Sequence, residues 1–221
     1  ADNPYTVDGY VDFSNLSARN ANLTLTANNY PLLNVRKSTI SEVYGRAYVD
    51  LNSTLRGPLE SLVMRGNLNI LSSTDMTYVL KDSKLTVQDR LGDMVEFVSF
   101  AGDSIIQPEP EGTLTNWGGL DMAVNINIDP SVKIGVDISE DRKNYVTLEG
   151  GGELSFNYTP QGDMSLTGRY ELSGGTFKYS LPVIPLEEFS IKNGSYVEWV
   201  GDMMNPRLNI VATERMRASV A

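Results

Sequence analysis

Neither cysteine nor histidine occurs among the 221 residues of the chain. Without cysteine there are no disulfides and no thiolate nucleophile, and without histidine there is no imidazole base and none of the usual zinc sites. These two absences exclude Ser-His-Asp relays, cysteine hydrolases and zinc-finger modules.

Positive charge is also scarce. The chain has 18 Lys and Arg against 28 Asp and Glu, a formal net charge of −10. A surface that binds phosphate backbones or anionic lipid headgroups needs a basic excess, so no nucleic-acid partner is expected. No run of about 18 apolar residues is present, and Ala1-Asp2-Asn3-Pro4 lacks the basic and apolar regions of a signal peptide. Because the chain also lacks an initiator methionine, we expect a soluble piece of a longer protein.

What the chain does have is hydrophobic content, 41%, arranged with a period of two. From Leu120 to Ile128 every even position is apolar and every odd position between them is small or polar, which is typical of a strand with one buried face. After Pro130 the same alternation continues to Ile138. Because Asp129-Pro130-Ser131 has turn composition, we predict a hairpin there between two antiparallel strands.

Further runs with the same period follow. We predict turns at Pro160–Asp163, at Gly174-Gly175 and at Asn193-Gly194, with strands between them. The strands are long for a compact sandwich, and no amphipathic helix is evident. The fold class predicted is all-β, an antiparallel meander.

The chain is expected to divide into three segments. Residues 1–100 form an N-terminal β segment, in which residues 84–100 are read as strand with a turn at Leu91-Gly92-Asp93. Residues 101–119 lose periodicity and are rich in Pro and Glu, so they are predicted to be a loop or linker. Residues 120–221 form a C-terminal β meander of the same domain.

The sequence contains only weak signals for a catalytic or phosphate-binding site. Glu149-Gly150-Gly151-Gly152-Glu153 resembles a phosphate loop, but no helix follows it. We therefore interpret Gly150 and Gly152 as gaps on the apolar face where another wall or a ligand approaches. Candidate carboxylate pairs for glycoside hydrolysis are Asp8 with Asp12, Glu109 with Glu111, and Asp137 with Glu140 and Asp141. Their simpler interpretation is a solvated surface, so we predict no enzyme, no metal and no cofactor.

The apolar face must be covered by something. A second sheet would make a closed β-sandwich, such as a carbohydrate-binding or adhesion module. A curled sheet would instead leave a groove for acyl chains or apolar segments. From alternation alone the closed core is favoured, because covered faces are the usual outcome.

The C-terminal third changes this preference. It carries Gly168-Arg169-Tyr170-Glu171-Leu172, Gly174-Gly175-Thr176-Phe177-Lys178-Tyr179, Phe189-Ser190-Ile191-Lys192-Asn193-Gly194, Trp199-Val200-Gly201-Asp202 and Pro206-Arg207-Leu208-Asn209-Ile210. In this order and spacing, the series resembles the C-terminal region of the TamB family, in its Bacteroidetes-like branch. Gly45-Arg46-Ala47-Tyr48-Val49 and Gly66-Asn67-Leu68 fit the same pattern upstream. One departure is that Asp202 is followed by Met203 where the family commonly has proline, so we expect a looser bend there.

The resemblance implies an elongated, curved antiparallel sheet that forms a β-taco, an open trough with an apolar interior. It also implies a periplasmic protein whose full-length form is anchored in the bacterial inner membrane by an N-terminal helix. Its partner would be a TamA-like outer-membrane barrel protein. Its cargo would be phospholipid acyl chains or nascent outer-membrane β-strands, since the family is connected with outer-membrane protein assembly and with AsmA-like phospholipid transport.

On this basis we predict the residues that line the trough and those that form the family's bend. The predicted lining residues are Leu120, Met122, Val124, Ile126, Ile128, Val132, Ile134, Val136, Ile138, Val146, Leu148, Leu154, Phe156, Met164, Leu166, Tyr170, Phe177 and Tyr179. The predicted bend residues are Trp199, Gly201, Asp202 and Pro206.

Overall fold

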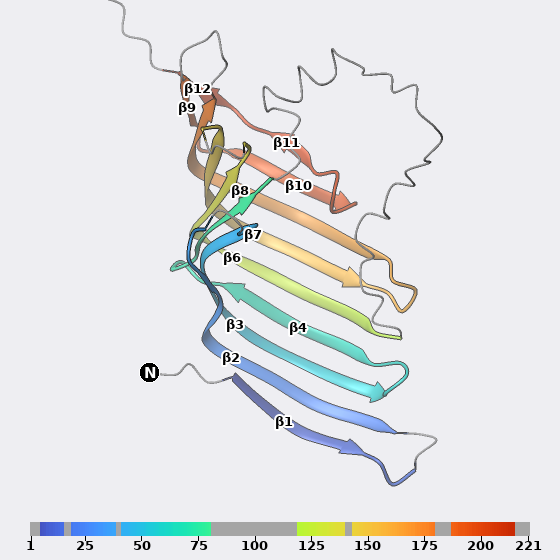
Figure 1. The fold of residues 1–221 in the computed structure, drawn as a ribbon. Coiled ribbons are helices and arrows are strands. Elements are labelled where there is room, and N and C mark those ends of the chain that lie inside the picture. Colours follow the sequence, from blue (N-terminus) through green and yellow to red (C-terminus); the bar gives the residue numbers. More distant parts are fainter. Residues whose placement is uncertain are drawn as a thin grey trace, which may run out of the picture.

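A computed structural model describes residues 5–15, 19–38, 41–80, 119–139, 143–179 and 187–214. This part of the chain contains strands and no helix, and all of its strands belong to one large sheet, as Figure 1 shows. The strands are β1 (Tyr5–Asp12), β2 (Asn20–Val35), β3 (Val43–Pro58), β4 (Val63–Ile70), β5 (Asp75–Val79), β6 (Asp121–Asp137), β7 (Tyr145–Tyr158), β8 (Met164–Tyr179), β9 (Glu187–Ile191), β10 (Ser195–Gly201), β11 (Arg207–Asn209) and β12 (Ala212–Thr213). The all-β prediction is confirmed.

The strand order is β1-β2-β3-β4-β6-β7-β8-β10-β11, with β5, β9 and β12 attached beside this path. Most neighbours are antiparallel, but β6 runs parallel to both β4 and β5. The predicted antiparallel sheet is therefore confirmed for most strand pairs, and this parallel seam is the exception. After β5 the chain returns to the sheet at β6, and Asp121 at the start of β6 pairs with Val63 at the start of β4. Alternation along one strand carries no information about the direction of its neighbour.

The predicted hairpin at Asp129-Pro130-Ser131 is also wrong, because β6 passes straight through these residues. The pairing of β6 with β7 steps from Ile128↔Gly152 to Val132↔Gly150, so the three residues form a bulge. The Ser131 N–H donates to Asp129 Oδ1 at 2.8 Å. A bulge tolerates proline, which cannot donate to a ladder hydrogen bond.

The turn predicted at Gly174-Gly175 is likewise wrong, since both glycines lie inside β8. The turn at Pro160–Asp163 is confirmed and joins β7 to β8, with the Thr159 N–H donating to the Asp163 carbonyl at 2.9 Å. The turn at Asn193-Gly194 is confirmed between β9 and β10. The predicted strands in 84–100 and the predicted linker, apart from Gly119, lie outside the described residues.

The sheet is creased along one line. At that line β2 shifts register between Ala27 and Tyr30, β6 shifts at its bulge, and β7 shifts at Glu149/Gly150. At the same level β3 changes its partner from β4 to β5, and β8 changes its partner from β10 to β9. Bulges bend and twist the strands that carry them. Aligned bulges therefore bend the whole sheet, and Figure 1 shows the long strands turning sharply toward β9 and β12.

We name the two parts of the sheet on either side of this crease the main leaf and the short leaf. The main leaf contains β1, β4, β10 and β11, the short leaf contains β5, β9 and β12, and the long strands run through both. Near the crease, Tyr170 and Val197 of the main leaf form a buried cluster with Leu172 and with Ile191 of the short leaf. Ile134, Val146 and Leu148 of the short leaf pack on the same cluster. The apolar side of the sheet is therefore the inside of the bend.

The glycine tract 150–152 has a structural explanation at this crease. A Cβ on Gly150 or Gly152 would collide with the carbonyl oxygens of Glu171 or Arg169 on β8, and one on Gly151 with that of Ile128 on β6. What approaches these glycines is the backbone of the adjacent strands, so the expectation of another wall or a ligand is corrected. Because these glycines have no side chains, the backbones of β6, β7 and β8 can approach one another closely where the sheet bends.

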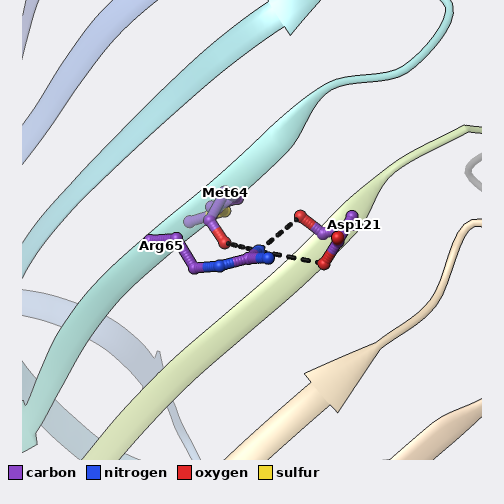
Figure 2. Close-up of polar contacts among 3 residues, drawn as sticks. All are labelled: Met64, Arg65 and Asp121. Carbon is purple, nitrogen blue, oxygen red and sulfur yellow. Dashed lines mark hydrogen bonds and ion pairs between the residues drawn. The ribbon is translucent and has the colours of Figure 1, made fainter.

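Side-chain contacts on the polar side hold the parallel seam between β4 and β6. The Arg65 guanidinium donates to the carbonyl oxygens of Met64 and Asp121 at 2.8 and 3.1 Å, and its Nη1 lies 2.9 Å from the Asp121 carboxylate (Figure 2). Farther along, the amide of Asn127 donates to that of Asn69 at 3.0 Å. These contacts define the register of the pair whose direction the sequence did not predict.

Candidate functional site

The predicted lining residues on β6, β7 and β8 share one side of the sheet. Residues in register on neighbouring strands point to the same side. The cross-strand rows are Met122–Tyr158–Met164, Val124–Phe156–Leu166, Ile126–Leu154–Gly168–Trp199, Ile128–Gly152–Tyr170–Val197, Val132–Gly150–Leu172, Ile134–Leu148–Gly175 and Val136–Val146–Phe177. Because the bulge at residues 129–131 preserves this parity, the apolar residues before and after it stay on the same side. We call this side the apolar face.

The N-terminal strands extend the apolar face, which the list of predicted residues missed. Parallel pairing places Leu68 beside Ile126 and Ile70 beside Ile128, and β3 adds Leu51 and Val49 in the same rows. Alternation in these strands was a sufficient signal to find them. Only the pairing shows that they continue the C-terminal rows.

Most of this face is only partly covered. Among the eighteen predicted residues, Val124, Val132 and Tyr170 are buried, and the other fifteen are of intermediate exposure. Coverage falls toward the β1 edge, where Tyr5 and Val7 are 48% and 52% exposed. A core closed by a second sheet would bury these side chains fully. Within the described ranges every strand belongs to the one sheet, so no second sheet covers the face.

Charge is absent from the rows themselves. No position in register with them on β1 to β8 or on β10 carries Asp, Glu, Lys or Arg. Charged pairs lie on the other side, for example Arg169 with Glu198 at 2.8 Å, which raises the pKa of Arg169 further. These rows therefore offer hydrophobic contact without a fixed charge to select a ligand, whereas beyond them Glu187 of β9 pairs with Tyr179.

Tyr170 is one of the polar side chains on the apolar face, with Ser53, Tyr158 and Ser195. It is 3% exposed, and its hydroxyl has no hydrogen-bond partner among the described residues. Burial raises the pKa of Tyr170 to about 12, with a smaller contribution from the negative charge of Glu149. An unpaired buried hydroxyl costs about 1 to 3 kcal/mol, so this position is a local weakness of the crease.

The segment predicted as the bend contains two hydrogen bonds that involve its side chains. The Trp199 indole N–H donates to the Met203 carbonyl at 3.1 Å, and the Met204 N–H donates to the Asp202 carboxylate at 2.9 Å. The bend joins β10, which ends at Gly201, to β11 just beyond Pro206. These two hydrogen bonds span the segment that contains Met203.

The candidate carboxylate pairs are not assembled into a site by the described structure. Asp8 and Asp12 lie four residues apart on the edge strand β1. Hydrogen bonds from the Ser14 hydroxyl and, at 2.8 Å, from the Ser14 N–H to the Asp12 carboxylate lower the pKa of Asp12. Asp137 is buried and accepts the Tyr44 hydroxyl at 3.1 Å. Glu109, Glu111, Glu140 and Asp141 lie outside the described residues.

Two further features are absent from the described part of the chain. It contains no group of three or more acidic side chains placed to hold a metal ion. It also contains no helix that is long and apolar enough to cross a membrane.

These features define a class: single-sheet β-proteins with a creased sheet, one apolar face and one polar face. The family model of the TamB C-terminal domain matches residues 1–220, so the chain belongs to that family. No curated protein and no solved structure matches the chain. Members of the family are envelope-associated proteins connected with the outer-membrane assembly machinery. Membership supports a TamB-like role in outer-membrane protein assembly or lipid transport.

Proposed function

We propose that the apolar face is the wall of a hydrophobic groove that shelters or conducts apolar cargo across the periplasm. The observation that carries this proposal is an uncharged apolar face on the inside of a creased sheet, most of it partly exposed. The cargo would be phospholipid acyl chains or nascent outer-membrane β-strands, in a TamB-like, envelope-spanning protein.

The energetics suit a lipid tail. Each methylene removed from water contributes about 0.8 kcal/mol, and the gain depends on area rather than on a specific contact. A tail can therefore slide along rows of Leu, Ile, Val and Phe without crossing a large barrier. Because the rows lack a cation to pair with phosphate, the headgroup would remain outside the groove.

The remaining parts of the proposal follow from family membership. The segment would lie in the periplasm, the full-length protein would be anchored in the inner membrane through a helix outside this chain, and a TamA-like barrel protein would be its partner. We propose a transport or chaperone role and no catalysis.

The groove is tested with two adjacent residues of β8 that lie on opposite sides of the sheet. Leu166 belongs to the apolar rows, and its neighbour Thr167 is exposed on the polar side. Leu166→Glu places a charge among acyl chains, which is strongly unfavourable. Thr167→Glu adds the same charge on the polar side.

The measurement is mass spectrometry of organic extracts from protein purified from bacterial envelopes. We expect phospholipid with the wild type and with Thr167→Glu, and several-fold less with Leu166→Glu at an unchanged far-UV spectrum. Equal lipid in both variants would refute the groove. Loss of β structure in Leu166→Glu alone would indicate an ordinary core, and co-purifying outer-membrane protein in place of lipid would favour protein cargo.

A further inference from the structure

The polar side of the short leaf contains a hollow that the groove does not use. Its volume is about 310 Å³, and it is lined by Lys37, Tyr44, Thr77, Gly135, Asp137, Tyr145, Val146 and Thr147. Register places most of these side chains on the side opposite the apolar face, because Tyr44 pairs with Thr77, Thr77 with Gly135, and Gly135 with Thr147. The hollow is therefore separate from the proposed lipid path.

Glycine opens the floor of the hollow. A Cβ at Gly135 would lie 2.6 Å from Thr77 Oγ1, so any larger residue would compete with the threonine for this space. Thr77 and Thr147 flank the glycine on the two adjacent strands and each contributes a hydroxyl that can donate and accept. The floor is therefore small and flanked by two hydroxyl groups.

The walls combine aromatic rings with one carboxylate. Asp137 is 6% exposed and accepts the Tyr44 hydroxyl at 3.1 Å, which orients both side chains. Tyr145 lies opposite Asp137 in the register of β6 and β7. Ring faces and edges offer apolar contact, while hydroxyl and carboxylate oxygens offer directed hydrogen bonds.

Charge narrows the class of ligand. The Lys37 ammonium lies 5.1 Å from the centre of the Tyr44 ring, and among the described lining residues Lys37 carries a positive charge and Asp137 a negative one. Lys178, 5.6 Å from the Tyr145 ring, is neutralised by Glu188 at 3.0 Å. An anionic ligand would meet Asp137 and a cationic ligand would meet Lys37. A neutral ligand rich in hydroxyl groups avoids both conflicts.

We propose that this hollow binds a neutral sugar ring, as one unit of a glycan strand, with Asp137, Thr77 and Thr147 bonding its hydroxyl groups and a tyrosine ring against its apolar side. The volume suits one ring, and the open mouth allows a polymer to continue beyond it. Such a site would hold the polar side of the sheet against a glycan while the apolar face remains free.

The test uses two threonines that face each other across β7 and β8 on the polar side. Thr147 lines the hollow, and its register partner Thr176 does not. Chitotriose is titrated into ¹⁵N-labelled protein, and backbone amide shifts are followed by NMR. We expect shifts confined to residues around Thr77, Gly135 and Thr147, with a dissociation constant on the order of 1 mM, as for a single shallow subsite.

Thr147→Val should weaken binding about fivefold or more, as expected for one lost hydrogen bond, whereas Thr176→Val should leave it unchanged. Asp137→Asn should weaken it as well. If that variant fails to fold, the threonine pair still decides the question. Absence of shifts, equal effects of the two valine variants, or tighter binding of phosphoethanolamine than of chitotriose would overturn the proposal.

Discussion

At the scale of single residues, Tyr170 shows how the crease combines packing with an unfavourable polar contact. Its ring lies in the buried cluster with Leu172 and Val197, while its hydroxyl has no partner in the described structure. Burial of the ring stabilises the folded state, and burial of the unpaired hydroxyl destabilises it. The same burial raises the pKa of the phenol.

We predict that Tyr170→Phe raises the free energy of unfolding by about 1 to 3 kcal/mol, because it removes a buried hydroxyl without removing a hydrogen bond of the described structure. Urea denaturation measures this. Destabilisation by more than about 1 kcal/mol would mean that the hydroxyl has a partner.

A pH dependence follows from the same residue. The phenol ionises near its ordinary pKa of 10.0 when unfolded and near about 12 when folded. Between these values the unfolded state has lost a proton that the folded state keeps, so stability falls as the pH rises. We expect the wild type to lose more stability than Tyr170→Phe over this window, with a constant difference below it. Parallel pH profiles throughout would contradict the assigned pKa.

At the scale of elements, the strands are continuous through the crease because glycine and bulges occur where they bend. Gly152 of β7 and Gly174 of β8 both lie near this line, but their surroundings differ. A Cβ on Gly152 would meet the Arg169 carbonyl oxygen, whereas a Cβ on Gly174 would meet nothing within 4 Å. The Arg169 carbonyl group cannot move out of the way of a new Cβ, because it belongs to the backbone of a paired strand, whereas a side chain could change its rotamer.

We therefore predict that Gly152→Ala lowers the free energy of unfolding by about 2 to 4 kcal/mol, as overpacking against backbone does. Gly174→Ala, the matched control, should be neutral or stabilising by up to about 1 kcal/mol, since it restricts the unfolded chain without a clash. The measurement is the urea midpoint of each variant. Equal midpoints would show that the glycine tract is not needed for the bend.

At the scale of the whole molecule, the sheet differs from a closed domain in what it leaves uncovered. Most side chains of the apolar rows keep intermediate exposure. The heat capacity change of unfolding arises mainly from newly exposed apolar surface. A sheet whose apolar face is already partly hydrated exposes less of it on unfolding.

Calorimetry of delipidated protein should therefore give a heat capacity change per residue below the usual value of about 12 to 15 cal/mol/K. The urea m-value should be low for the same reason. Values in the usual range for the lipid-free protein would mean that the apolar face is covered, and would refute the proposal of a groove.

What the sequence by itself determined was which apolar residues of an uninterrupted strand segment share one side of that segment. Side chains alternate along a strand for local steric reasons, so Ile126 and Leu166 were assigned to one face without knowledge of their neighbours. The all-β class and the turns at Pro160–Asp163 and Asn193-Gly194 follow from similarly local signals.

Only the tertiary structure decided how those strands are joined. Asp129-Pro130-Ser131 has the composition of a turn, yet backbone pairing with Gly150 and Gly152 makes it a bulge inside a long strand. The parallel direction of β4 and β6, and the alignment of the register shifts into one crease, depend on contacts between residues far apart in the chain. Such contacts leave no periodic trace in either strand, because hydrogen bonding between backbones does not depend on which side chains the strands carry.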